Sequence, residues 1–274
     1  MCRVLKVSRS GYYEWTTRPK STRELENEQI LECARKSQKE SKGIYGLDKM
    51  LEDVRETFPK CSRNRLYRIQ RKNRIYSVRK RKFKATTNSN HNLPVAENLL
   101  NQDFNVDSPN KVWVTDISYI NTEEGWLYLA AVKDLYNSEI VGWSVADNMK
   151  TQLCIKALND AVRRQRPSEG LIHHSDRGVQ YCSGAYQALL KKYGMKCSMS
   201  RKGNCYDNAC AETFFSTIKC EILYQNRYLT RDQARKDIFW YIEIFYNRKR
   251  RHQALGYETP IGYRIRYNKL KAAS

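Results

Sequence analysis

Three features are missing from this chain, and each missing feature excludes a class of protein. No run approaches the roughly 20 apolar residues of a membrane-spanning helix, so we expect no membrane partner. The amino terminus, Met1-Cys-Arg-Val-Leu-Lys-Val7, is too short and too interrupted by charge for a signal peptide, which predicts a cytoplasmic protein. No heptad repeat supports self-association through a coiled coil.

Paired cysteine motifs are also missing. The nine cysteines are scattered, and none of them forms a C-x-x-C pair. A disulfide framework is not expected in a chain of this size without a secretion signal. His173, His174 and Cys182 would form a zinc site only with a fourth ligand, and their spacing matches no recognised zinc motif.

Acidic residues are scarce relative to basic ones. The formal net charge is +21, from 50 Lys and Arg against 29 Asp and Glu. Such a charge produces strong self-repulsion, and nucleic acid is the commonest partner that explains it. The 274 residues, of which 41% are hydrophobic, are enough for a buried core and for two domains.

The first part of the chain predicts short helices. Ser21-Thr-Arg-Glu24 has the form of a capping box at a helix start. Residues 47–54 carry apolar side chains at helical spacing, and Ser62-Arg-Asn-Arg-Leu66 opens a further helix. Two short helices about a turn, the second rich in arginine, indicate a relative of the helix-turn-helix or winged-helix domains.

A basic segment follows these helices. Residues 60–84 contain twelve Lys or Arg and no Asp or Glu. The segment would be a solvated linker if it were only charged, but Tyr67, Tyr76 and Phe83 lie among the charges, which favours contact with DNA. The candidate DNA-binding residues here are Arg65, Arg68, Arg79, Lys80 and Arg81.

The rest of the chain predicts an α/β domain. Strand and helix patterns alternate in a way that describes a mixed five-stranded sheet flanked by helices. We expect strands over 112–120, 126–132, 139–145, 171–174 and 196–200, and helices over 151–164, 183–193 and 206–223. The predicted domains are a helical basic DNA-binding region (1–88), a linker (89–108), a catalytic core (109–225) and a C-terminal helix with a basic tail (226–274).

Three acidic residues are the best candidates for chemistry. Asp116 interrupts an apolar strand, where an unpaired charge is costly to bury. Asp176 ends another strand, and Glu212 lies on a predicted helix. Carboxylates from two strands and a helix can meet at one point, and carboxylate oxygens are the ligands that Mg²⁺ prefers. Asp207, which would lie on a different face of the helix, is interpreted as a helix-start carboxylate.

A wider set of motifs surrounds these acids. They are Trp113-Val-Thr-Asp-Ile-Ser-Tyr119, His174-Ser-Asp-Arg-Gly-Val-Gln-Tyr181, and Asp207-Asn-Ala-Cys-Ala-Glu212 with Lys219. The chain start, Leu5 to Trp15, and the end, Phe245-Tyr-Asn-Arg248 through Pro260, continue the pattern. Together they resemble the transposases encoded by the second reading frame (OrfB) of the two-frame bacterial insertion sequences of the family numbered three.

The resemblance implies a ribonuclease-H-like catalytic core similar to that of retroviral integrases. It implies that Asp116, Asp176 and Glu212 hold two Mg²⁺ ions, or Mn²⁺ in their place, with Asp116 between the ions. The implied activity is cleavage at the ends of a mobile element and transfer of the 3′ hydroxyl to DNA. The implied partners are double-stranded DNA (terminal inverted repeats and target), further copies of the chain on DNA, and an upstream-frame (OrfA) product as a fusion or a separate chain.

Further residues are candidates for DNA contact. Lys219 lies two helical turns after Glu212 on the same face, where a lysine can bind the phosphate backbone. His174 has two readings, a DNA contact or an ordinary hydrogen-bonded histidine. The remaining candidates are Asn208, Arg177, Gln180, Arg201, Lys202, Arg248 and Arg251.

Three alternatives remain open at this point. Arg248 to His252 with the nearby Tyr257 resembles the arginine, histidine and tyrosine set of tyrosine recombinases, which need no carboxylate triad. A nuclease of ribonuclease-H fold would cut without joining. A DNA-binding repressor would explain the charge and the helical region, but not the three acids.

Overall fold

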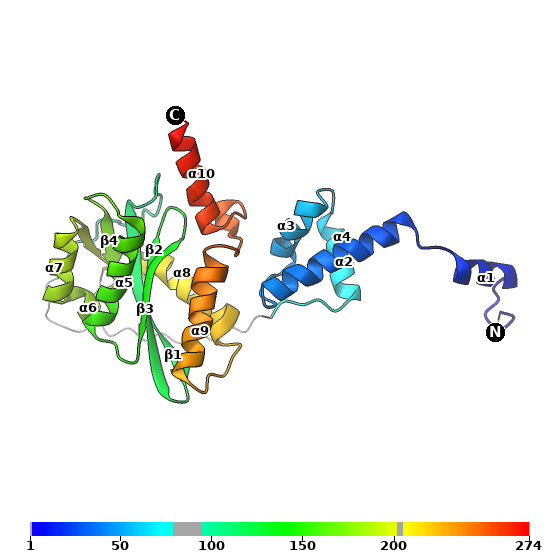
Figure 1. Ribbon diagram of the computed structural model, residues 1–274, viewed down its shortest axis with the longest axis horizontal. Helices are drawn as coiled ribbons and strands as arrows, with labels where there is room; N and C mark the ends of the chain where they lie inside the picture. The colour runs from blue at the N-terminus through cyan, green and yellow to red at the C-terminus, as the bar shows by residue number, and fades with distance from the viewer. Residues whose placement is uncertain (1, 79–94, 202–204, 274) are drawn as a thin grey trace. The chain divides into compact units, whose positions relative to one another are not determined.

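The computed structural model of the protein describes residues 2–78, 95–201 and 205–273. The chain divides into two compact units, Met1–Ser77 and Val78–Ser274 (Figure 1). No helix of the described residues is long and apolar enough to span a bilayer. The eight cysteines whose side chains are described are free thiols.

The first unit is a small helical domain. Its helices are α1 (Arg9–Thr17), α2 (Thr22–Glu40), α3 (Leu47–Thr57) and α4 (Arg63–Lys72). The predicted capping box is present: Ser21 Oγ accepts from the Glu24 amide at 3.2 Å, and Glu24 Oε2 accepts from the Ser21 amide at 2.8 Å. Helices α2 to α4 share one core, which contains Ile30, Met50 and Leu66. The predicted pair of short helices about a turn is therefore confirmed in α3 and α4.

The second unit is built on the predicted mixed sheet. Its strands are β1 (Val112–Thr122), β2 (Gly125–Asp134), β3 (Ile140–Ala146), β4 (Ile172–Ser175) and β5 (Lys196–Met199). The strand order is β3-β2-β1-β4-β5. The β1–β2 and β2–β3 pairs are antiparallel, whereas β4 is parallel to both β1 and β5.

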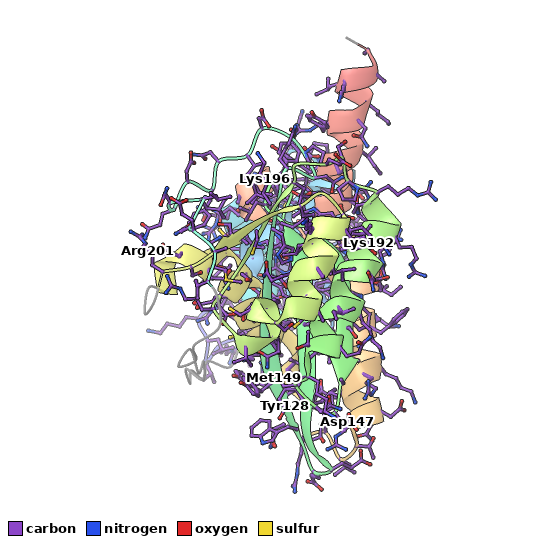
Figure 2. All side chains as sticks on the ribbon, turned by 90° about the vertical axis from the view of Figure 1, so that its left-hand side faces the viewer. Tyr128, Asp147, Met149, Lys192, Lys196 and Arg201 are labelled. Carbon is purple, nitrogen blue, oxygen red and sulfur yellow. The ribbon has the colours of Figure 1, made fainter. Side chains whose placement is uncertain are left out.

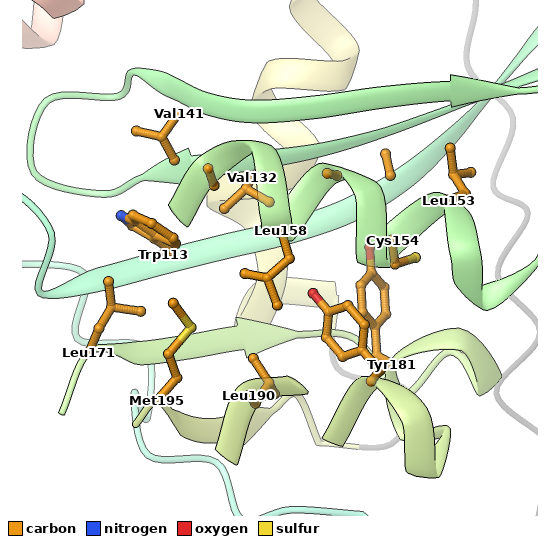
Figure 3. Close-up of a cluster of buried hydrophobic side chains, with 14 of the residues drawn as sticks. Trp113, Val132, Val141, Leu153, Cys154, Leu158, Leu171, Tyr181, Leu190 and Met195 are labelled. Atoms are coloured by element: carbon orange, nitrogen blue, oxygen red, sulfur yellow. The ribbon is translucent and has the colours of Figure 1, made fainter. Parts of the chain in front are cut away.

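One face of the sheet is covered by α5 (Thr151–Gln165), α6 (Val179–Cys182) and α7 (Gly184–Lys192) (Figure 1). Figure 3 shows the core between them, where Trp113 and Val132 of the sheet meet Leu158 of α5 and Leu190 of α7. This core holds the α5 face dry, because its central side chains are fully buried. In Figure 2, Tyr128, Asp147 and Met149 are gathered at one end of this unit.

The other face receives α8 (Ala209–Ile218), where Ala211 packs against Val112 and Val114. The 3₁₀ turn η1 (Cys205–Asn208) precedes α8, and the π-helical turn η2 (Lys219–Leu223) follows it. The single helix expected over 206–223 thus divides into three pieces. The π turn keeps Ile222 and Leu223 buried and brings Glu221 to Arg250, which a continuous α-helix would present differently.

The C-terminal part packs on the same unit. It contains α9 (Arg231–Phe239), the π-helical η3 (Trp240–Tyr246), the 3₁₀ turn η4 (Gln253–Leu255) and α10 (Pro260–Ala272). The capping box predicted at Thr230 and Gln233 is present. The apolar stripe Ile238, Tyr241, Ile242 and Phe245 is buried, as expected of core packing. Asn247 extends the edge of the sheet, because its side chain accepts from the Ile140 amide and donates to the Ile140 carbonyl.

The contact between β3 and α5 generates a stability prediction. A Cβ on Gly142 would lie 2.4 Å from the Ala157 carbonyl oxygen and 2.4 Å from the Ala161 nitrogen, both backbone atoms of α5. Gly142→Ala should lower the free energy of unfolding in urea by about 1–3 kcal/mol or more, because helix and strand must separate. Gly184→Ala is the control: a Cβ there meets nothing within 4 Å. In a helix that change is neutral or stabilising by up to about 1 kcal/mol. Equal stability of Gly142→Ala and wild type would contradict the close approach.

Candidate active site

The register of two parallel strands brings Asp116 and Asp176 to the same level. Val114 pairs with His174, and two residues further along each chain stand the two aspartates. Alternate residues of a strand share one face, so each aspartate lies on the face of its pairing residue. That face is the one on which Val114 packs against α8. Asp116 therefore projects from the sheet towards α8, and Asp176, the residue after β4, lies close enough for its charge to act on Asp116.

Helix α8 brings Glu212 to the same face. Asn208, at the start of the helix, donates from Nδ2 to the Thr115 carbonyl at 3.4 Å, and Ala211 is buried against Val114. Glu212 follows Ala211 directly and is exposed at the surface. The start of α8 is thus fixed on β1 one residue from Asp116, which places the third carboxylate beside the other two.

The charges of the three carboxylates interact. Burial raises the pKa of Asp116 well above its usual range, and the charges of Asp176 and Glu212 raise it further. The pKa of Glu212 is also raised, first by partial burial and then by Asp176. Each negative charge makes the next one harder to form, so the site favours a bound cation. In the described part of the chain, however, no group of three or more His, Cys, Asp or Glu side chains is arranged to hold a metal ion.

Backbone amides fix two of the carboxylates. Asp116 Oδ1 accepts from the Ile117 amide at 2.7 Å, and Asp176 Oδ1 accepts from the Gly178 amide at 2.9 Å. A Cβ on Gly178 would lie 3.0 Å from Asp176 Oδ1. Gly178 has an ordinary extended backbone, φ −62°. It is therefore needed for space beside the carboxylate rather than for an unusual turn.

Lys219 lies at the junction between α8 and the π turn η2. Its side chain is half-buried, and burial lowers the pKa of its ammonium group while the charge of Asp116 opposes that shift. Lys219 thus supplies a positive charge close enough to Asp116 to interact with it. The two-turn spacing from Glu212 leaves both residues on one face of the helix.

Three of the expected DNA contacts are interior residues: Asn208, whose bond to the Thr115 carbonyl is given above, His174 and Gln180. His174 is fully buried, with Nδ1 2.8 Å from Ser198 Oγ and Nε2 3.2 Å from Ser200 Oγ. Burial lowers its pKa to about 4, so the ring is neutral. Gln180 is also buried, and its amide donates to the Met149 carbonyl at 2.9 Å. The reading of all three as DNA contacts is corrected: they are buried hydrogen-bonding residues, as the second reading of His174 had it.

His173 points to the other face of β4, where its Nε2 lies 3.0 Å from the Tyr186 hydroxyl. His173 and His174 therefore do not face a common ion, and the zinc alternative has no geometric support.

Asp207 does not cap α8, so the helix-start interpretation is wrong. It is buried, and it accepts from Arg201 through the backbone amide at 2.8 Å, Nε at 3.0 Å and Nη2 at 3.0 Å. Asn98 and Gln102 donate to the same carboxylate, each at 3.0 Å. The hydrogen bonds of Arg201 hold the pKa of Asp207 well below its usual range. Asp207 closes the segment that begins at Arg201, a function that local sequence cannot reveal.

The other candidate DNA contacts differ in how exposed they are and in whether they bond within the chain. Arg177 donates to the Ser200 carbonyl at 2.6 Å and is half-exposed. Arg65 is held within its own unit by Glu26 at 2.8 Å and Asn27 at 2.8 Å, whereas Arg68 is exposed. Arg248 is exposed, and Arg251 donates to the Tyr257 carbonyl at 3.4 Å. The candidates outside the described residues are Arg79, Lys80, Arg81 and Lys202.

Sequence reasoning missed two buried cations beside the site. Lys133 is buried on the α8 side of the sheet and donates to the Cys210 carbonyl at 3.0 Å, which holds the first turn of α8. Arg250, part of the basic run, turns inward and pairs with Glu221 through Nε at 2.8 Å and Nη2 at 2.7 Å. A lysine at the end of the apolar run Leu127 to Val132 was a usable signal for the first. No residue near Arg250 in the sequence predicts its ion pair with Glu221.

Comparisons with known proteins agree with both units. Residues 106–205 and 193–260 match two family models described as integrase core domain, and residues 24–83 match an HTH-like domain. A 31 kDa uncharacterized protein of insertion element IS600 from Shigella sonnei is 48% identical over 272 residues, which are 99% of this chain and 100% of that protein. Transposase InsF for insertion sequence IS3A from Escherichia coli (strain K12) is 40% identical over 262 residues, 95% of this chain and 91% of that protein.

The solved structures are less similar to this chain in sequence than these relatives are. The HTLV-2 integrase catalytic core domain in complex with magnesium is 18% identical and has a TM-score of 0.45, over 57% of this chain and 97% of that chain. A simian T-cell lymphotropic virus intasome in complex with the PP2A regulatory subunit B56 gamma is 17% identical and has a TM-score of 0.44, over 69% of this chain and 63% of that chain.

Lys133 generates a prediction about pH. Burial lowers its pKa from 10.5 to about 8 in the folded protein. Between these values the unfolded chain binds more protons than the folded chain, so stability rises with pH through this window. The difference between the two pKa values corresponds to about 3 kcal/mol. Urea unfolding of wild type and Lys133→Met at pH 7.5 and 10.5 should show the wild type gaining about that amount relative to the variant. Parallel pH profiles would show that Lys133 is not buried as an ammonium group.

Proposed function

Because the chain belongs to the transposases of the IS3 insertion-sequence family, we propose that Asp116, Asp176 and Glu212 are its catalytic residues in DNA transposition. The observation that supports the proposal most is the parallel pairing of Val114 with His174, because Asp116 and Asp176 each follow two residues later. The raised pKa values of Asp116 and Glu212, to which the charge of Asp176 contributes in both cases, support it, since perturbed carboxylates gather at functional sites.

The proposed reaction has two displacements at phosphorus. In the first, the oxygen of water bonds to the phosphorus at the element's end, and the bond to the 3′ oxygen breaks, which leaves a 3′ hydroxyl. In the second, that 3′ hydroxyl bonds to a phosphorus of another DNA segment, whose own 3′ oxygen leaves. The protein forms no covalent bond with DNA. Lys219 holds the phosphate backbone beside the carboxylates, and the amides of Ile117 and Gly178 keep two carboxylates oriented.

The donor set fits divalent magnesium. All three candidate ligands are carboxylates, which are hard oxygen donors, and their mutual repulsion is relieved by a cation. We propose that Asp116, Asp176 and Glu212 hold two Mg²⁺ ions, with Mn²⁺ able to replace them. When bound, the ions would activate the attacking oxygen and stabilise the leaving oxygen. Residues Asp116 and Asp176 are already fixed by the backbone, so Glu212 on the exposed helix face is the ligand with room to move.

The partners follow from the family and the charge. We propose that double-stranded DNA, as terminal inverted repeats and as target, contacts the HTH-like region and the exposed cations Arg68 and Arg248. The proposed domain limits are 1–88, 89–108, 109–225 and 226–274. We also propose that several copies assemble on DNA, with an upstream-frame product as a fusion or a partner. We propose that the reaction takes place in the cytoplasm, where the DNA of a bacterial cell lies.

The alternatives differ in their products. A nuclease of the same fold would cut and not join, and a repressor would bind and do neither. A tyrosine recombinase would form a covalent protein–DNA bond through Tyr257 and would need no carboxylates. The chain belongs to the transposase family, and this favours the transposition reaction over the three alternatives.

Asp176→Asn tests the proposed chemistry. It should lower magnesium-dependent cleavage of labelled DNA carrying the element's own end by more than about 100-fold, because loss of a direct ligand exceeds the 10- to 100-fold cost of an outer one. DNA affinity should stay within about 3-fold, because basic residues dominate binding. The matched control is Asp147→Asn, an exposed aspartate outside the site, which should cleave like wild type.

The reaction products distinguish the proposed transposase from the alternative functions. Cleavage followed by joined products, in magnesium and not in EDTA, is the expected result for the wild type. Cleavage without joining, repeated with the upstream-frame fusion, would indicate the nuclease. If Asp176→Asn cleaves as well as Asp147→Asn, the assignment of the three carboxylates fails.

A further inference from the structure

A groove shares Lys219 with the candidate active site, and none of the three carboxylates lines it. Its volume is about 940 Å³, and it is formed between the second half of β1 and the chain from η2 to the start of α9. Its lining residues are Tyr119, Ile120, Asn121, Thr122, Glu123, Lys219, Leu223, Tyr224, Asn226, Arg227 and Tyr228. All of them lie in the second unit. We call it the hairpin groove.

The hairpin groove continues from the carboxylates along both elements that carry them. On β1, Ile120 and Thr122 share the strand face of Asp116, and Ile120 is about 13 Å from it at the usual rise per residue. On the helix, Lys219 follows Glu212 by about 10 Å along the axis. Lys219 therefore stands between the carboxylates and the groove. A DNA strand that crosses the carboxylates reaches this mouth within about two or three nucleotides.

The far end of the groove is closed by fixed contacts. The Glu123 amide donates to the Tyr228 carbonyl at 3.0 Å, and Arg227 Nε donates to Glu123 at 2.6 Å. Arg231 ties the hairpin further, from its amide to Glu124 Oε2 at 2.8 Å and from Nε to the Trp126 carbonyl at 3.1 Å. These bonds hold the tip of the β1–β2 hairpin against the segment before α9. The far wall of the groove is therefore held in place by hydrogen bonds within the second unit.

The lining chemistry fits nucleobases. Tyr119 and Tyr224 are partly exposed, and aromatic residues stack on bases of any sequence, whereas Tyr228 is buried and forms the wall behind them. Asn121 is exposed and carries an amide that can donate to and accept from base edges, whereas the amide nitrogen of Asn226 already donates to the Ile222 carbonyl at 3.2 Å and to Asp237 at 3.1 Å. Arg227 is paired with Glu123, which leaves Lys219 as the cation at the mouth, suited to a phosphate. A volume within the roughly 300–1,000 Å³ of small-molecule pockets admits about one to three nucleotides and excludes a duplex.

We propose that the hairpin groove binds unpaired nucleotides of the DNA end, next to the phosphate that is cut. The proposal rests on the proposed function, because it takes the DNA end as the substrate of the neighbouring carboxylates. Lys219 holds the backbone at the mouth, and one or more bases stack inside the groove. Held in this way, the bases cannot return to their partner strand. The DNA end is thereby kept open while its phosphate lies at the carboxylates.

The test uses binding in EDTA, so that it does not depend on cleavage. Two labelled duplexes carry the element's own end; one is fully paired, and the other has its last three pairs replaced by mismatches. Fluorescence anisotropy of the full chain should show on the order of 10-fold tighter binding of the mismatched end. Tyr224→Ala should lose this preference, and Tyr224→Phe, which keeps the ring, should retain it. The affinity for the paired duplex and the melting temperature serve as folding controls.

Photo-crosslinking of the wild type gives a second readout that needs no variant. 5-Iodo-2′-deoxyuridine at the mismatched positions should crosslink to peptides containing residues 119–123 or 219–228. Absence of any preference in the wild type would overturn the proposal, and so would an unchanged preference in a folded Tyr224→Ala or crosslinks confined to other peptides. A failure here with magnesium-dependent cleavage intact rejects the groove alone. If the wild type keeps the preference but cleaves no DNA in magnesium, the proposed function fails instead and the groove stands.

Discussion

The parallel pairing of β1 with β4 is the constraint on which the rest of the site depends. A slip of one residue would turn one aspartate to the α5 face, into the core around Trp113 and Leu158, where a carboxylate has no partner. On its other side β4 is tied to the β5 edge, where the His174 ring contacts Ser198 and Ser200. A histidine expected at the DNA surface thus joins β4 to its second neighbour from inside the sheet.

Around this constraint the fold holds charges that repel one another. Asp116 and Glu212, whose pKa values are raised, lower the stability of the folded chain, and the cost is tolerated because neighbouring elements are tied firmly. Lys133 fixes the first turn of α8, and Asp207 fixes the turn before it through Arg201, Asn98 and Gln102. Beyond Lys219, the buried pair of Glu221 and Arg250 joins the helix to the C-terminal segment. The helix is therefore anchored on both sides of Glu212.

Local patterns predicted most of the fold, because each depends on neighbours in sequence. The capping boxes at Ser21 and Thr230, the β1–β2 hairpin and the mixed sheet all follow from spacing of this kind. The errors arise where partners lie far away in the chain. Asp207 is held by Asn98, Arg250 by Glu221, and His174 by the β5 edge, and no pattern around these residues announces the partner. The catalytic assignment of the three acids stays a prediction, although the strands and helix that carry them are where they were expected.

The internal pairs of Arg65, Arg201 and Arg250 have a consequence for how the charge of +21 acts on DNA. Each of these guanidinium groups already faces a carboxylate of its own chain. A guanidinium group that is already paired with a carboxylate displaces few counterions from a DNA phosphate. The salt dependence of DNA affinity counts only the counterions that are released, so its slope will fall short of the number of basic residues in the motifs. Some residues of the basic runs form ion pairs within the chain. A count of lysines and arginines therefore overstates the number of phosphates that the protein contacts.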